Sequence, residues 1–179
     1  MIGVLFAAQP VVAQQIQGAG ATFPARVYAR WAENYARSSG VQIDYKLTGS
    51  GDGIKRANSR EVDFGGTDTA LPATELSQKK LVQLPMLIGG IVPVVNLPGG
   101  AANRLVLSGP VLAGIMSGQI PAWDDPRIGK LNPGLKLPNL AIKRLVRADK
   151  SGSSEALTRY LAMQSKDFES LVGVGHLPR

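Results

Sequence analysis

The stretch VQIDYKLTGSGDGIKRANS, residues 41–59, decides the fold. Its apolar side chains alternate with polar ones at Val41, Ile43, Tyr45 and Leu47, which is the pattern of a half-buried strand. The glycine-rich turn TGSGDG at 48–53 follows at once and leads into a short helix predicted over 54–59. A strand that passes through a glycine turn directly into a helix indicates an α/β architecture.

The segments on either side of this stretch continue the alternation of strands and helices. An amphipathic helix is predicted over 24–38, with Tyr28, Trp31 and Tyr35 on one face that we expect to lie in the core. Proline and glycine divide the apolar run 84–97, which we therefore interpret as two short buried strands. The remaining predicted elements are strands at 62–64, 105–107 and 142–146 and helices at 74–80, 109–117 and 155–164.

The composition excludes several classes of chemistry. The 179 residues contain no cysteine and a single histidine, His176, so thiolate catalysis, disulfides and cysteine-based metal sites are ruled out. The formal charge of +7 favours anionic partners in general. The basic residues are scattered and do not form a run interleaved with aromatics, so we expect no nucleic-acid partner. The residues indicate no metal and no cofactor.

The N-terminus has the character of an export signal. Residues 1–17 carry no charge, and the small residues Val11 and Ala13 satisfy the cleavage rule before Gln14, so residues 1–13 are interpreted as a residual signal peptide. No cysteine follows that could carry a lipid anchor. The Pro98-Gly99-Gly100 sequence is the best candidate for a hinge, and it divides the chain into residues 14–97 and 98–179.

Three turns share one design, a Gly/Ser/Thr sequence that opens directly into a helix. They lie at 21–24, 48–51 and 150–153. The first turn of a helix has unpartnered N–H groups and a positive dipole end, which together bind oxyanions. Any one of these turns alone is better explained as ordinary N-capping. All three in one chain, with Arg147 just before the third, favour a dry oxyanion pocket.

Asp68, which follows Phe64-Gly65-Gly66-Thr67, does not suit a simple anion site. A turn or capping role is the plain interpretation. The functional alternative is that the ligand carries a proton. A hydrogen phosphate offers an O–H that a carboxylate can accept, whereas sulfate offers none and leaves the carboxylate an unpaired charge.

Five stretches in order give the sequence a specific resemblance: GAGATFP at 18–24, GSG at 49–51, DFGGTD at 63–68, GQIPAWDDP at 118–126 and RADKSGS at 147–153. They resemble the substrate-binding protein of the bacterial high-affinity phosphate ABC transporter. The resemblance implies a periplasmic binding protein-like, type II two-lobed α/β fold, with a first lobe at 14–97 and an incomplete second lobe at 98–179. It also implies a periplasmic monomer that binds inorganic phosphate and delivers it to membrane permease subunits and their ATPase.

By the same resemblance, eight residues are expected to contact phosphate, and none is catalytic. Hydroxyl or backbone donors come from Thr22, Phe23, Ser50, Ser151, Gly152 and Ser153, Arg147 provides the charged contact, and Asp68 accepts the proton of the ligand. Two positions depart from the family pattern, since Lys150 stands where glycine is usual and Ser153 where threonine is usual. Members of that family are also roughly twice as long as this chain.

A secreted phosphate-ester hydrolase with the same oxyanion pocket is the alternative from another class. Ser50 or Ser151 would then need a general base, which no internal histidine supplies. The motifs of P-loop proteins and α/β-hydrolases are absent from the sequence.

Overall fold

The structure, a computed structural model, describes residues 15–175, apart from the side chains of 99–101. The predicted signal peptide at 1–13 and His176 lie outside the described residues. The chain begins with a parallel sheet in the order β2-β1-β3, made by β1 (Gln15–Gly20), β2 (Gln42–Leu47) and β3 (Phe64–Gly66). Gly20 of β1 is in register with Leu47 of β2 and with Gly66 of β3. All three strands therefore end at one edge of the sheet.

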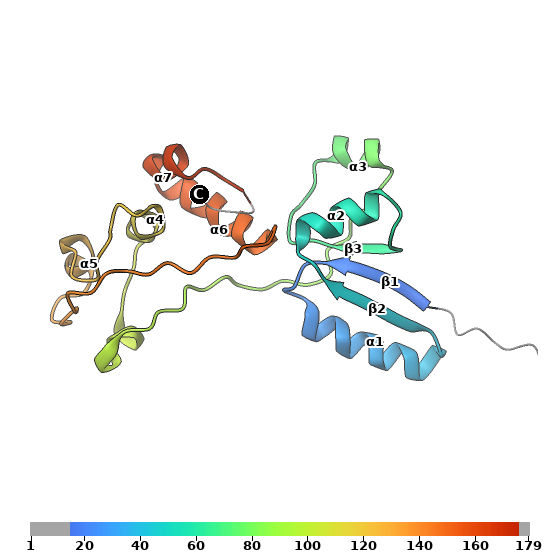
Figure 1. The fold of residues 1–179 in the computed structure, drawn as a ribbon, viewed down its shortest axis with the longest axis horizontal. Coiled ribbons are helices and arrows are strands. Elements are labelled where there is room, and N and C mark those ends of the chain that lie inside the picture. The colour runs from blue at the N-terminus through green and yellow to red at the C-terminus, as the bar shows by residue number, and fades with distance from the viewer. Residues whose placement is uncertain (1–14, 176–179) are drawn as a thin grey trace, which may run out of the picture.

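Helices α1 (Ala25–Ser39) and α2 (Ser50–Asn58) cover opposite faces of this sheet (Figure 1). Helix α2 packs unusually close, because a Cβ on Gly53 would lie 2.6 Å from the Cα of Gly20 and 2.6 Å from the carbonyl oxygen of Gly66. On the α1 face, the rings of Tyr28 and Tyr45 meet edge to face at 5.1 Å. The strand-turn-helix reading of 41–59 and the α/β class are confirmed.

The predicted core role of the α1 aromatics is correct for Tyr28 and wrong for the other two. Tyr28 contacts the sheet through Tyr45, whereas Trp31 stacks on Tyr28 and keeps 43% of its surface exposed. Tyr35, further along the helix, is 47% exposed. The narrow three-stranded sheet thus buries only part of the apolar face that the helix presents.

The second group of elements consists of helices. Helix α3 (Ala73–Lys79) still lies beside the sheet (Figure 1). The helices of the second group are η1 (Pro98–Arg104), α4 (Gly109–Ser117), α5 (Pro126–Leu131), α6 (Gly152–Gln164) and α7 (Lys166–Leu171). Two apolar clusters form their core. One is built on Ala113, Leu161 and Phe168, and the other on Ile115, Ile120 and Ile128. None of the described helices has the length and apolar character required to cross a bilayer.

The strands predicted at 84–97, 105–107 and 142–146 are absent from the described part of the chain. Residues 81–97 and 139–150 instead run between the two groups of elements as connecting segments (Figure 1). Ile88, predicted to be buried, is 98% exposed. An apolar segment forms a strand only where a neighbouring strand exchanges hydrogen bonds with it, and within residues 15–175 these segments pair with none.

Several boundaries differ from the prediction in a way that matters for function. Helix α2 begins at Ser50 and α6 at Gly152, so both start earlier than predicted, inside their glycine turns. Strand β3 covers 64–66 instead of 62–64, and the short helices α5 and α7 were not predicted. The early starts place the N-termini of α2 and α6 at the turns that the sequence marked as anion sites.

Candidate anion-binding site

The site is built on the edge at which the parallel strands end. The chain leaves β1 at Gly20 and enters α1 at Ala25, and it leaves β2 at Leu47 and enters α2 at Ser50. Both helices therefore begin beside the same edge. Gly49 has φ 90°, a left-handed value that glycine adopts without strain and that turns the chain sharply into α2. The carboxyl edge of a parallel sheet is where open α/β folds bind ligands.

Helix α6 contributes a third N-terminus from the other group of elements. The Gly51 N–H donates to the carbonyl of Lys150 at 3.2 Å, which joins the start of α2 to the loop before α6. A Cβ on Gly152 would lie 2.4 Å from Ser50 Oγ and 2.7 Å from the Cβ of Asp68. Only glycine permits this approach, so the N-terminus of α6 lies directly against α2 and the turn after β3.

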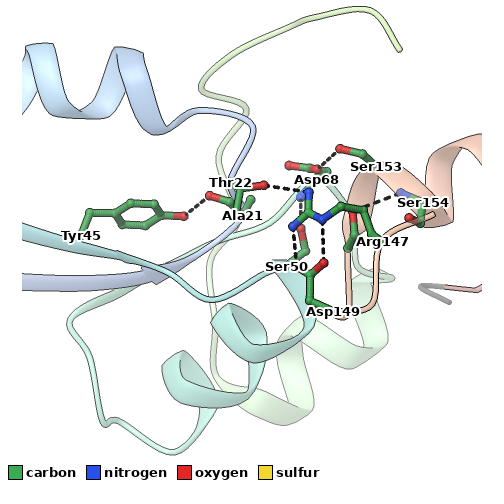
Figure 2. Close-up of polar contacts among 10 residues, drawn as sticks. Ala21, Thr22, Tyr45, Ser50, Asp68, Arg147, Asp149, Ser153 and Ser154 are labelled. Atoms are coloured by element: carbon green, nitrogen blue, oxygen red, sulfur yellow. Dashed lines mark hydrogen bonds and ion pairs between the residues drawn. The ribbon is translucent and has the colours of Figure 1, made fainter. Parts of the chain in front are cut away.

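Hydrogen bonds connect the predicted site residues across these segments (Figure 2). The backbone N–H of Asp68 donates to Ser50 Oγ at 3.1 Å, and Ser153 Oγ donates to Asp68 Oδ2 at 3.0 Å. Arg147 Nη1 donates to Thr22 Oγ1 at 3.1 Å. Residues separated by up to 125 positions in sequence are thus in contact.

Arg147 is paired with Asp149 as well as with Thr22. Its Nε donates to Asp149 Oδ1 at 2.7 Å and its Nη2 donates to Asp149 Oδ2, so the contact is two-pronged. This hydrogen-bonded guanidinium lowers the pKa of Asp149 below its ordinary value. The prediction of a dry pocket is wrong, since the Arg147 side chain is 44% exposed and Asp68 is exposed as well.

The formal charges of the four ionisable side chains in these loops cancel: Arg147 and Lys150 are positive, and Asp68 and Asp149 are negative. These four side chains therefore supply no net charge to attract an anion at this edge. The attraction must come from oriented N–H groups at the starts of α1, α2 and α6, together with serine and threonine hydroxyls.

The remaining predicted residues occupy different positions around the edge. Ser151 is buried and caps α6, because its hydroxyl accepts from the Ser154 N–H at 3.3 Å. Phe23 follows Thr22 in the first turn, but its ring packs against Gly89, where an added Cβ would lie 2.5 Å from it. Only the backbone of Phe23 is therefore available to an anion bound beside Thr22.

Sequence reasoning missed two residues that support the site. Asp149 lies two positions after Arg147, beyond a bend at 148–149, and this short separation of opposite charges could have indicated the pair. Tyr45 donates its hydroxyl to the carbonyl of Ala21 at 2.9 Å and so braces the first turn. Burial, followed by the nearby Tyr28 and the charge of Asp68, raises the pKa of Tyr45.

Within residues 15–175, no three His, Cys, Asp or Glu side chains gather into a group that could hold a metal ion. The groups present at this edge are hydrogen-bond donors, the half-exposed guanidinium of Arg147 with its partner Asp149, and the carboxylate of Asp68. Such a set suits a small tetrahedral oxyanion that carries a proton.

The sequence is similar to one family model and to several curated proteins. The model of the PBP superfamily domain matches residues 7–172. The chain is 44% identical over 177 residues to the "Phosphate-binding protein PstS" of Pasteurella multocida, covering 98% of this chain and 52% of that relative. It is 45% identical to the protein of that name from Haemophilus influenzae, covering 91% and 49%, and 37% identical to that from Methanocaldococcus jannaschii, covering 89% and 43%. The chain spans about half the length of the curated relatives it matches.

Proposed function

This chain belongs to the PBP superfamily, and on that premise we propose that it binds inorganic phosphate in its hydrogen phosphate form. One observation carries the proposal. Residues from four segments lie at the edge where three helices begin: Arg147 bonds to Thr22, and Asp68 bonds to Ser50 and Ser153. The name shared by the relatives, phosphate-binding protein, supports phosphate as the ligand.

The proposed contacts with the ligand are made by the hydrogen-bond donors that can point toward the carboxyl edge of the sheet. Arg147 is fixed through Nε and Nη2 by Asp149, so its Nη1, now bonded to Thr22, is the group that can reach an oxygen of the ligand. The other donors are the hydroxyls of Thr22, Ser50, Ser151 and Ser153 and the backbone N–H groups of Phe23 and Gly152.

Asp68 determines which anion is accepted. Its Oδ2 accepts a hydrogen bond from Ser153 Oγ at 3.0 Å, so the carboxylate already acts as an acceptor at this edge. The O–H of hydrogen phosphate satisfies it in the same way, and Ser153 is then released to donate to a ligand oxygen. Sulfate near neutral pH brings no proton, so its oxygens face the carboxylate directly and are repelled.

The wider role proposed for the chain is phosphate uptake. The protein would act as a monomer in the periplasm, after removal of residues 1–13, and deliver phosphate to the permease subunits and ATPase of an ABC transporter. The first lobe would comprise 14–97 and the second, truncated, 98–179. The two groups of elements joined by segments 81–97 and 139–150 support this division (Figure 1).

Binding without turnover is favoured over the phosphate-ester hydrolase. The relatives are named as binding proteins, and the hydroxyls of Ser50 and Ser151 accept hydrogen bonds from the Asp68 and Ser154 N–H groups. Isothermal titration with phosphate, sulfate and a short oligonucleotide, run beside a phosphatase assay, distinguishes these possibilities. Saturable phosphate binding with no ester hydrolysis is expected, and hydrolysis abolished by Ser50→Ala would overturn the proposal.

A further inference from the structure

The loop that follows β3, residues 67–71, carries Asp68 to the anion site and is held by hydrogen bonds on several sides. The Thr69 N–H donates to Thr67 Oγ1 at 3.0 Å. Gln83, which lies on one of the connecting segments, donates from Nε2 to the Thr69 carbonyl at 2.8 Å. The backbone that follows Asp68 is therefore fixed both within the loop and to the connecting segment.

Side-chain hydrogen bonds also join this loop to helix α6, and they run in both directions. Ser153 Oγ on the helix donates to Asp68 Oδ2 at 3.0 Å. Thr69 Oγ1 on the loop donates to Glu155 Oε2 at 2.7 Å, a contact between residues 86 positions apart in the sequence. Two adjacent residues of the loop are thus bonded to the first turns of the helix.

Glu155 is well placed to hold the Thr69 hydroxyl. Its side chain is only 13% exposed, and Arg159, one turn further along α6, donates from Nη2 to Glu155 Oε1 at 2.8 Å. One carboxylate oxygen therefore accepts from the arginine and the other from Thr69. Hydrogen bonds to a carboxylate are stronger than those between neutral groups. The helix dipole favours an acidic residue near the start of α6, but it does not account for the contact with Thr69.

Thr69 and Glu155 lie beside the anion site. They line a cleft of about 710 Å³ together with Asp68 and Gly152, which the proposed function assigns to the ligand. The two residues therefore border the proposed ligand contacts without belonging to them.

We propose that Thr69 and Glu155 form a positioning pair, which keeps the Asp68 carboxylate directed at the ligand after Ser153 has released it. In the proposed function, on which this inference rests, the O–H of hydrogen phosphate replaces Ser153 at Asp68, and that exchange removes one bond between the loop and α6. The Thr69–Glu155 bond uses neither Ser153 nor Asp68, so it persists through the exchange and holds the loop on the helix.

Loss of the pair should affect phosphate and sulfate differently. Hydrogen phosphate gains from Asp68 only when the carboxylate meets its O–H with the distance and angle of a hydrogen bond. Sulfate is repelled by the same carboxylate over a wider range of positions, because charge repulsion falls off slowly with distance. A loop without the pair should therefore bind phosphate more weakly and sulfate almost as before. The ratio of the sulfate to the phosphate dissociation constant then falls.

The test compares Thr69→Val with Thr69→Ser by isothermal titration with phosphate and with sulfate. Valine keeps the shape of threonine without the hydroxyl, and serine keeps the hydroxyl. Thr69→Val should lower the ratio of the two dissociation constants by roughly threefold to tenfold, as expected for one hydrogen bond, and Thr69→Ser should keep the ratio of the unmodified chain. Glu155→Ala should lower the ratio to the same extent, and the double variant should lower it no further.

The matched control is Arg159→Gln, which removes the other hydrogen bond of the same carboxylate from a side chain that is 62% exposed. It should change the ratio by less than about twofold. If Thr69→Val fails to fold, Glu155→Ala tests the same bond from its other end.

Two results would overturn the positioning role and leave the proposed function intact. One is a ratio that stays unchanged in Thr69→Val and Glu155→Ala. The other is an equal weakening of phosphate and sulfate binding, which would mean that the pair only stabilises the fold. An unmodified chain that binds no phosphate would instead overturn the proposed function, and the positioning role with it.

Discussion

Replacing Asp68 with asparagine should abolish much of the preference for phosphate over sulfate. The substitution keeps the size of the side chain but exchanges a carboxylate for an amide, which can donate to either anion. With Asp68 present, hydrogen phosphate gains a charge-assisted hydrogen bond, and sulfate faces a like charge at contact distance. The backbone N–H of Asp68, which bonds to Ser50 Oγ at 3.1 Å, is untouched, so the edge should keep its shape.

The size of the expected loss of discrimination between phosphate and sulfate depends on how exposed the Asp68 carboxylate is. Two unit charges about 4 Å apart repel by about 1 kcal/mol in water and about 4 kcal/mol near a protein surface. Solvent screening at an exposed carboxylate places the expected loss of discrimination near 1–3 kcal/mol, or about fivefold to 150-fold in the ratio of dissociation constants. Isothermal titration of both variants with phosphate and with sulfate at pH 7 measures that ratio. A ratio unchanged in Asp68→Asn refutes the role assigned to the carboxylate.

Four further substitutions test the supporting geometry. Arg147→Ala should weaken phosphate binding by about 1–2 kcal/mol, less than a fully buried pair loses, because the guanidinium is half exposed; a change beyond about 4 kcal/mol in titration would contradict this. Tyr45→Phe removes the bond to the Ala21 carbonyl and should lower the free energy of unfolding in urea by about 1 kcal/mol, whereas no change would mean that the bond contributes nothing. Lys150→Gln should slow the association of phosphate by roughly twofold to threefold at low salt and reduce the salt dependence of the association rate, while the dissociation rate stays unchanged. Stopped-flow measurements give both rates, and a change in the dissociation rate alone would mean that the ammonium contacts the ligand directly. Asp125 caps α5, and hydrogen bonds from the arginine two residues later hold its pKa at about 2. Asp125→Ala should therefore lower the free energy of unfolding above pH 3.8, and the difference in stability between the two proteins should vanish as pH falls through about 2. A difference in stability that persists below about pH 2 would indicate lost packing instead.

Individual helices and strands could be predicted because each depends on the pattern of residues within its own segment. Alternation over 41–47 predicted the strand β2, and the glycine turns at 48–53 and 150–153 predicted that a helix follows each, although α2 and α6 begin earlier than predicted, at Ser50 and Gly152. Pairing of strands is not local. The segments at 84–97 and 142–146 have strand-like sequences, but within the described residues they pair with no strand, and the one isolated bridge, between Ala122 and Ala141, lies outside them.

The composition of the site could be predicted better than its environment. The turns were marked as anion sites from their glycines and hydroxyls, and the structure brings them together at one edge. Exposure depends on what covers a residue from elsewhere in the molecule, which no local pattern records. For that reason the sequence did not reveal that the Arg147 side chain is 44% exposed.

The central claim is that donors from three separate helix starts converge on one anion. Amide chemical shifts of Phe23, Ser50 and Gly152, followed by nuclear magnetic resonance during titration with phosphate, test it most directly. The account predicts that all three signals move together and fit one dissociation constant, while sulfate at equal concentration moves them far less. Signals that respond with different constants, or a response confined to one of the three turns, would contradict it.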